Sequence, residues 1–216
     1  MAEISSVNPS SPEPTSVARA AELLRRGEVI AIPTDTFYGI AANPFDPAAV
    51  EKVFAIKGRP KGNPLLLLID SIAMAEELAA DLPPEFYVLA KRFWPGPLTM
   101  VVQASSKLPE EVTANTGTIG LRLPRAPVAM ALIREMGCPI TATSANRTGE
   151  PDCSNAQQVE STLGNRLRLI IDGGGSHADK PSTVIGLIGK SWEILREGSI
   201  PRSEVAACLE AWNGGN

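Results

Sequence analysis

Apolar residues along the chain follow two patterns, a helical spacing of three and four, and short runs in which they are adjacent or alternate. The helical spacing, together with capping residues and proline in the first turn, predicts helices. The first has Thr15 or Ser16 as its N-cap and Gly27 just past its end, and the second has Asp46 as its N-cap and Pro47 at its first helical position. The predicted helical stretches are 15–27, 46–58, 72–80, 84–93, 128–135 and 156–163.

The short runs predict strands, and the order of strands and helices predicts the fold class. The strands expected are 29–33, 64–69, 97–103, 118–124, 138–143, 168–172, 182–188 and 192–197, and 34–43 is expected to be a loop. The last three strands follow one another through tight connections, which indicates antiparallel pairing among them. Strands that alternate with helices, followed by adjacent strands, indicate an α/β fold with a sheet of mixed parallel and antiparallel direction and flanking helices.

The chain length and the absence of a linker favour one domain. No internal repeat and no low-complexity segment separates Gly27 from Pro201, and 216 residues suit one large domain. The first residues are polar and rich in proline, without the apolar segment of a signal peptide. We therefore expect a flexible leader over 1–14, a folded domain over 15–201 and a C-terminal tail over 202–216.

Composition excludes several classes of function. The formal charge is −4 and aromatic residues make up 5%, which argues against a protein that coats nucleic acid through bulk charge or base stacking. A single histidine, His177, excludes zinc sites that need two histidines from one chain. The three cysteines, Cys138, Cys153 and Cys208, fit no disulfide framework and predict reduced thiols. The longest apolar run, 65–69, is too short to cross a bilayer, so a cytoplasmic protein is expected.

Two glycine-containing segments resemble phosphate-binding loops only in part. The sequence GLIGKS at 186–191 has Val184 where a P-loop would have its first glycine, and it lies between two strands rather than before a helix. The three glycines at 173–175 also precede no helix, unlike those of a dinucleotide-binding loop. A hairpin turn and a flexible loop are the better predictions.

The segment IKGRPKGNP at 56–64 is a stronger candidate for binding phosphate. It places the cations Lys57, Arg59 and Lys61 at a helix end, together with Asn63, two glycines and two prolines. Such cations can simply complement the helix dipole in solvent. Glycines that let the backbone approach a ligand and prolines that stiffen the loop favour a polyphosphate site instead.

Three further polar segments lie at the ends of predicted strands, where α/β sheets bind ligands. They are PTDTFYG at 33–39, ATSANRTGEP at 142–151 and the strand TIGLRLP at 118–124. In an alternating strand Thr118, Gly120 and Arg122 share one face. Each segment alone is also compatible with an ordinary turn or a solvent-exposed strand. Together with 56–64 they predict a cleft for an anionic ligand.

In this order, PTDTFYG, KGRPKGNP, TIGLRLP, TSAN with a following GEP, STVI and ILREG resemble the YrdC/TsaC family of L-threonylcarbamoyladenylate synthases, from about Ala18 to Pro201. The chain ends soon after Pro201 and so resembles the short form of that family. The resemblance implies a YrdC-like domain with a twisted mixed sheet and a concave basic cleft. It implies synthesis of threonylcarbamoyl-AMP and pyrophosphate from L-threonine, bicarbonate and ATP with Mg²⁺, without a dedicated protein cage for the metal.

The same resemblance implies roles for particular residues. It places threonine against Thr36, Arg122, Ala142 and Ser182, with Ala142 acting through its backbone. It implies that Lys57 and Arg59 are catalytic, and it assigns ATP binding to Lys57, Arg59, Asn63, Thr118, Ser144, Asn146 and Arg196. Implied partners are the tRNA threonylcarbamoyl transferase proteins downstream, with tRNA or double-stranded RNA as a further contact. The implied reaction needs positioning and charge neutralisation more than a histidine base or a side-chain nucleophile.

Three positions depart from the family pattern, and two other functions stay open. Leu68 stands where many relatives have histidine, Pro181 precedes the STV motif in place of glutamate, and Asp152 replaces a frequent serine. One alternative is an RNA-binding protein resembling the YciO branch, in which the same arginines would contact RNA phosphates without adenylate synthesis. A generic α/β nucleotide-binding protein is the other, and it leaves the ordered set of motifs unexplained.

Overall fold

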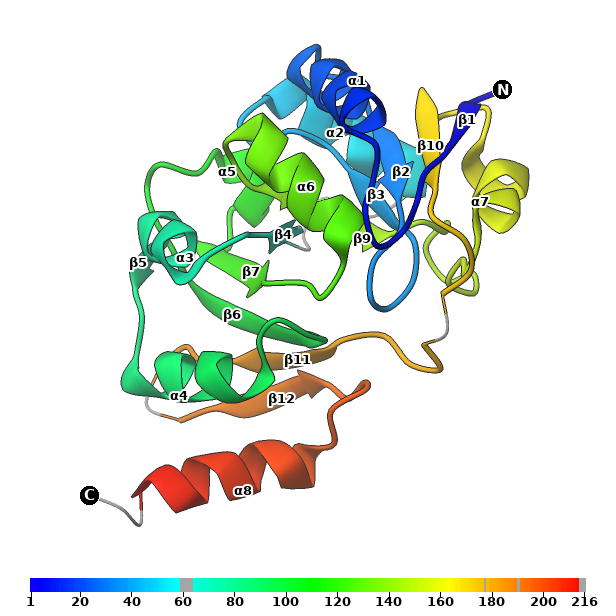
Figure 1. Cartoon of the computed structure of the whole chain (residues 1–216). Helices are drawn as coiled ribbons and strands as arrows, with labels where there is room; N and C mark the ends of the chain where they lie inside the picture. Colours follow the sequence, from blue (N-terminus) through cyan, green and yellow to red (C-terminus); the bar gives the residue numbers. More distant parts are fainter. Residues whose placement is uncertain (59–63, 177, 190, 214–216) are drawn as a thin grey trace.

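A computed structural model describes residues 1–58, 64–176, 178–189 and 191–213, and these residues form two mixed sheets flanked by helices (Figure 1). The first sheet has the order β1-β10-β2-β3-β9. Its strands are β1 (Glu3–Ser6), β10 (Leu169–Asp172), β2 (Ile30–Ile32), β3 (Gly39–Ala41) and β9 (Thr143–Ser144). Parallel pairs join β1, β10 and β2, whereas β3 is antiparallel to both β2 and β9.

The second sheet has the order β12-β11-β6-β7-β4-β8, with β5 paired to β6 outside this path. Parallel pairs join β11 to β6 and β4 to β7, and the other pairs are antiparallel. The predicted mixed direction is therefore confirmed. The strands are β12 (Glu193–Arg196), β11 (Thr183–Gly186), β6 (Leu98–Ala104), β7 (Thr118–Arg122), β4 (Leu66–Leu68), β8 (Ile140–Thr141) and β5 (Ala79–Asp81).

The expectation of a single sheet is wrong, because the strand predicted at 138–143 divides between the two sheets. Its first part, β8, pairs with β4, and the next strand, β9, pairs with β3. Ala142 alone separates them, and its N–H donates to the Leu66 carbonyl across 2.8 Å. One residue thus joins the two sheets.

Helices cover the outer faces of both sheets and bury an aliphatic core. They are α1 (Pro14–Arg25), α2 (Pro47–Lys57), α3 (Ile72–Leu78), α4 (Pro84–Phe93), α5 (Glu110–Thr113), α6 (Pro127–Met136), α7 (Ala156–Leu163) and α8 (Arg202–Asn213). Figure 1 shows α1 beside α6 over the upper part of the molecule, and apolar side chains of both helices share one cluster with β2 and β10. None of the helices in the described part of the chain has the length and apolar character needed to span a membrane.

Local capping signals account for the helix boundaries. The Asp46 carboxylate accepts from the N–H groups of Ala48 and Ala49, and Gly58 ends α2 with a left-handed φ of 59°, so this helix is confirmed in detail. The prediction that Thr15 or Ser16 caps α1 is wrong. The N-cap is Glu13, because Pro14 occupies the first turn and is well suited to it.

The ends of the chain are more ordered than expected. Glu3–Ser6 pairs with Leu169–Asp172 over four register positions, and both Ala2 and Val7 are buried. The predicted flexible leader is therefore wrong at β1. At the other end, the predicted tail contains α8, whose buried Val205 and Leu209 join the main core. Figure 1 shows α8 lying beside α4, far from the N-terminus.

Two other strand predictions need correction. The loop expected at 34–43 contains β3, which pairs on both sides. Antiparallel pairing among the last three strands holds for β11 and β12 but not for β10, which lies in the other sheet parallel to its neighbours. The segment at 186–191 connects β11 to β12, as the hairpin reading predicted, although Lys190 lies outside the described residues.

Candidate ligand-binding site

A cavity of about 690 Å³ is lined by residues of both sheets. It brings together every predicted site residue that the structure describes: Thr36, Lys57, Thr118, Arg122, Ala142, Ser144, Asn146, Ser182 and Arg196. Arg59 and Asn63, and likewise Lys61 and His177, lie outside the described residues. The predicted convergence of the polar loops on one cleft is therefore confirmed for the described part of the set.

The floor of the cavity is one face of the seven-stranded sheet. Thr118, Gly120 and Arg122 of β7 all line it, as the alternation predicted. A Cβ at Gly120 would lie 3.3 Å from the Thr99 methyl group and 3.6 Å from Leu66 Cδ1. Glycine therefore keeps the floor low between β4 and β6, where a larger side chain would project into the ligand space.

The loop between β2 and β3 forms one wall and is held by hydrogen bonds. The Thr34 hydroxyl accepts from the Thr36 N–H at 3.1 Å and donates to the Phe37 carbonyl at 2.7 Å. The Ser176 hydroxyl donates to the Thr36 carbonyl. The Thr36 side chain, 6% exposed, therefore faces the cavity from a fixed backbone.

Tyr38 fixes the same loop from the core. Its hydroxyl donates to the Gly174 carbonyl at 2.7 Å, and the Gly173 N–H donates back to it at 3.2 Å. Burial first, and then the nearby charge of Asp172, raise the pKa of Tyr38 to about 12. The phenol therefore stays protonated at neutral pH, where it anchors the loop.

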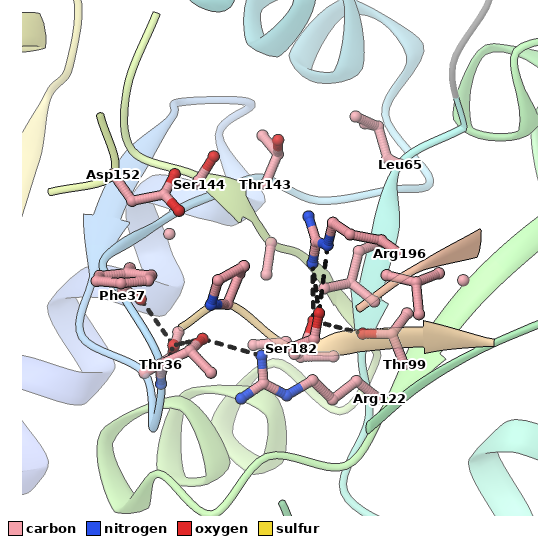
Figure 2. Close-up of a pocket in the computed structure, with 18 of the residues that line it drawn as sticks. Thr36, Phe37, Leu65, Thr99, Arg122, Thr143, Ser144, Asp152, Ser182 and Arg196 are labelled. Carbon is pink, nitrogen blue, oxygen red and sulfur yellow. Dashed lines mark hydrogen bonds between the residues drawn. The ribbon is translucent and has the colours of Figure 1, made fainter. Parts of the chain in front are cut away.

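Arg122 lies at the end of β7 with its guanidinium 3% exposed. Its Nε donates to the Gly96 carbonyl at 3.1 Å, Nη1 donates to Thr36 Oγ1 at 3.1 Å, and Nη2 donates to Asp35 Oδ1 at 2.5 Å. Figure 2 shows the guanidinium reaching toward the space between Thr36 and Ser182. Each of its three nitrogens thus has an acceptor in the protein.

Lys57, at the end of α2, is buried against the segment 144–146 and also lines the cavity. Its ammonium lies 2.5 Å from the Ser144 carbonyl, 3.0 Å from the Asn146 carbonyl and 2.9 Å from Asn146 Oδ1. The Ser144 hydroxyl oxygen, 3.3 Å from the ammonium, is a fourth acceptor, so the segment offers enough acceptors for all three N–H donors of Lys57. Within the protein, Lys57 holds the position of this polar segment.

Asn146 extends that network to Asp152. Its amide nitrogen lies 2.5 Å from the Glu150 carbonyl and 3.2 Å from Asp152 Oδ1, while its Oδ1 accepts from the Ser144 hydroxyl at 2.7 Å. Asp152, one of the departures from the family pattern, therefore orients Asn146. A carboxylate can do so because it accepts hydrogen bonds only.

Arg196 and Ser182 form the opposite wall. Arg196 Nη2 lies 2.8 Å from the Ser182 carbonyl and 3.1 Å from its hydroxyl, and Ser182 Oγ lies 2.9 Å from Thr99 Oγ1 (Figure 2). Burial, with the charge of Arg122 as a smaller contribution, lowers the pKa of Arg196, and the charge of Asp152 opposes this shift. The guanidinium nevertheless stays protonated at neutral pH.

Sequence reasoning missed some of the lining residues. Thr99 was assigned only to a strand, although a threonine within an otherwise apolar stretch, 98–102, was a usable signal for a cavity-facing position. Leu68 lines the cavity and is fully buried, so its departure from histidine gives an apolar contact. Asp35 was noted as a polar loop residue, but its ion pair with Arg122 was not foreseen.

A mixed α/β fold whose two sheets enclose guanidinium, ammonium, hydroxyl and amide groups defines a class of protein that binds small anionic ligands. The sequence profile of the Sua5/YciO/YrdC family, described as telomere recombination, matches residues 22–198. Since this match covers most of the chain, the chain belongs to that family.

Individual relatives agree with this assignment. The chain is 41% identical over 194 residues to a protein of Bacillus subtilis named threonylcarbamoyl-AMP synthase, covering 89% of this chain and 56% of that relative. The structure of Pyrococcus abyssi Sua5 complexed with L-threonine has a TM-score of 0.92 and 38% identity, covering 95% of this chain and 60% of the other. Escherichia coli YciO has a TM-score of 0.86 and 28% identity, covering 93% and 98%. The chain thus spans little more than half the length of the first two proteins.

Proposed function

We propose that this protein synthesises threonylcarbamoyl-AMP from L-threonine, bicarbonate and ATP, releasing pyrophosphate. The observation that carries the proposal is the convergence of the described motif residues on one cavity. Its support is the relative named threonylcarbamoyl-AMP synthase and the similar fold of a Sua5 complexed with L-threonine. The volume of about 690 Å³ suits a nucleotide with a small amino acid beside it.

The threonine end of the proposed site is the wall near Thr36, Arg122 and Ser182. Arg122 and Thr36 offer an N–H and a hydroxyl to the carboxylate, and Ser182 offers a second hydroxyl. Ala142 contributes its methyl group and backbone surface, because its N–H already donates to Leu66. From the sequence, Ala142 was expected to contact threonine through its backbone. In this proposal the N–H of Ala142 is not the group that contacts threonine.

For the nucleotide end we propose the surface formed by Thr118, Ser144, Asn146 and Arg196, together with Arg59 and Asn63. Lys57 belongs to this end as a positioning residue, because its three N–H donors hold the segment 144–146. The expected direct contact between Lys57 and phosphate is therefore replaced, in this proposal, by control of Ser144 and Asn146. Arg59 keeps its expected role beside the phosphates.

The proposed reaction joins the two ends of the site. The threonine amine adds to the carbon of bicarbonate with loss of water, and the resulting carbamate oxygen attacks the α-phosphorus of ATP. The bond from that phosphorus to the bridging oxygen breaks, and pyrophosphate leaves with both electrons of the bond. Arginine and hydroxyl groups neutralise and orient these anions, so no side-chain nucleophile is needed.

Magnesium is proposed to arrive with ATP. Among the described residues no group of three or more histidine, cysteine or acidic side chains is placed to hold a metal ion. Asp152 is the carboxylate that lines the described cavity, and it already accepts from Asn146. Phosphate oxygens and water are ordinary ligands of Mg²⁺, and the ion would supply neutralisation of phosphate charge.

The test is pyrophosphate release from ATP, measured with each substrate omitted in turn. We expect release to require both L-threonine and bicarbonate, and labelled bicarbonate to enter a nucleotide product. Release that continues unchanged without L-threonine would overturn the proposal. The matched control replaces L-threonine with L-alanine, which has the amine and carboxylate without the hydroxyl.

An RNA-binding function like that expected for the YciO branch is the second candidate, favoured by the similarity to Escherichia coli YciO. In that case the chain would bind tRNA or double-stranded RNA and release no pyrophosphate in the assay above. The downstream tRNA threonylcarbamoyl transferase proteins and the cytoplasmic location stay predictions.

A further inference from the structure

The carboxylate of Asp35 lies behind the proposed threonine site, out of the cavity. Within 34–39 every residue except Asp35 lines the cavity. Its side chain is 12% exposed, and Oδ1 accepts from Arg122 Nη2 at 2.5 Å. Asp35 therefore contacts the guanidinium from the protein side, while Thr36 contacts Nη1 at the cavity wall.

Two anchors together fix the plane of the Arg122 guanidinium. Gly96 accepts from Nε at 3.1 Å, and its own N–H donates to the Leu123 carbonyl at 2.9 Å, so this turn is tied to the end of β7. A Cβ at Gly96 would lie 2.5 Å from the Phe93 carbonyl oxygen, so a side chain there would shift the turn. With Nε and Nη2 both held, rotation about the last side-chain bonds is blocked.

We propose that Asp35 is a positioning residue that holds Nη2 and so presents Nη1 of Arg122, beside the Thr36 hydroxyl, to the carboxylate of the amino-acid substrate. Asp35 does not contact that substrate. This inference rests on the proposed function, since it names how one end of the proposed site is oriented.

The state of the other Asp35 oxygen supports a positioning role. Among the described residues, Oδ2 is buried and has no hydrogen-bond partner. A buried carboxylate oxygen without a partner is costly, and folded proteins keep such groups mainly where they serve another group. A carboxylate that only balances the charge of Arg122 does not need to be buried. In Asp35, Oδ2 is removed from solvent while Oδ1 contacts Arg122.

The negative charge of Asp35 opposes the binding of a carboxylate. The direction in which threonine affinity changes when Asp35 is replaced therefore tests the proposal. Asp35 partly neutralises Arg122, so removing its charge alone would strengthen the attraction of Arg122 for a carboxylate. Removing the hydrogen bond would free the guanidinium to turn away, which weakens carboxylate binding and alignment. A positioning residue and a mere counter-ion therefore predict opposite changes in threonine affinity.

The experiment compares Asp35→Ala and Asp35→Asn with the wild type, measuring the KM for L-threonine, the KM for ATP and kcat. We expect Asp35→Ala to lower kcat/KM for L-threonine by roughly 10- to 100-fold, with the KM for ATP changed less than about twofold. Asn keeps an acceptor oxygen toward Nη2, so Asp35→Asn should recover much of this loss. Unchanged or tighter threonine binding in both variants would overturn the proposal, and so would an equal loss for ATP.

Asp46→Ala is the matched control, because Asp46 caps α2 and does not line the cavity. It should lower the melting temperature without a selective rise in the threonine KM. If Asp35→Ala does not fold, Asp35→Ser takes its place, because its shorter side chain also withdraws the acceptor from Nη2, and its threonine KM must rise at least about threefold while its ATP KM stays constant. A threonine KM like that of the wild type would overturn the proposal.

A measurement without substrate separates this inference from the proposed function. The Nη2–H of Arg122 that donates to Asp35 should show slow hydrogen exchange by NMR in the wild type and fast exchange in Asp35→Ala. If the wild type releases no threonine-dependent pyrophosphate but shows this difference, the proposed function fails and the positioning of Arg122 stands. The same exchange rate in both proteins means that Asp35 does not position Arg122.

Discussion

Lys57 holds the segment 144–146 in place with a charge that the family resemblance assigns to phosphate. Its side chain is 5% exposed, and its ammonium bonds join the end of α2 to Ser144 and Asn146. Thr148 strengthens the same junction, since its N–H and hydroxyl both donate to the Lys57 carbonyl. Under the proposed function, this cation acts by fixing other residues that bind the substrate.

Replacing Lys57 with Met should destabilise the protein as well as weaken nucleotide binding. The substitution removes one donor from the oxygens of Ser144 and Asn146 and leaves the Asn146 carbonyl without its ammonium partner, so we expect the free energy of unfolding to fall by about 1–3 kcal/mol. Chemical denaturation measures this change, and ATP affinity is measured on the folded fraction.

Lys52→Met on the same helix is the control. Lys52 is half exposed, donates to the Gly27 carbonyl and lies 3.9 Å from Glu28, so its loss should cost less than about 1 kcal/mol. Full stability of Lys57→Met together with weaker ATP binding would instead indicate a direct phosphate contact.

At the scale of elements, the helices were predictable because their signals are local. Both ends of α2 are marked by residues at or next to the helix itself, namely Asp46, Pro47 and Gly58. Strand β1 was missed because EISS contains one apolar residue, and its partner β10 lies near the other end of the chain. Strand β1 forms because it pairs with a distant segment, and its own four residues do not indicate a strand.

Removal of residues 1–7 tests this element. It takes away the parallel pairing with β10 and the buried Ala2 and Val7, so we expect the free energy of unfolding to fall by about 2 kcal/mol or more. Thermal unfolding followed by circular dichroism measures the change.

Ser11→Gly is the control for that deletion, because Ser11 is exposed and lies outside β1. An unchanged melting temperature after the deletion would restore the prediction of a dispensable leader and leave β1 without a stabilising role.

The residues of the site were predictable where polar side chains lie at the ends of strands. The contacts between those side chains were not predictable. The alternation of Thr118, Gly120 and Arg122 was sufficient to place them on one face. The pairing of Asp35 with Arg122 and of Lys57 with Asn146 depends on how the two sheets meet. The order of residues along the chain does not show how close residues of the two sheets lie to one another.

For the whole molecule, the cavity couples the two sheets because each supplies one part of its lining. A ligand that contacts both parts should stabilise the entire fold, by about 2.7 kcal/mol at a concentration 100 times its dissociation constant. We expect ATP with L-threonine to raise the melting temperature and to slow hydrogen exchange both in 34–38, which joins β2 and β3 of the first sheet, and in 182–186, which contains β11 of the second sheet. Protection of only one of these segments would indicate that the ligand contacts one sheet alone.

The single residue between β8 and β9 has a consequence for the size of acceptable substrates. Ala142 is the shortest connection between the two sheets in the described chain, so at this point the separation of the sheets is set by one residue and not by an adjustable loop. Such a short spacer cannot lengthen without shifting the register of a strand on either side. Ala142 lines the cavity, so we expect this edge of the cavity to keep its width, and under the proposed function an amino acid longer by one methylene should bind more weakly than L-threonine.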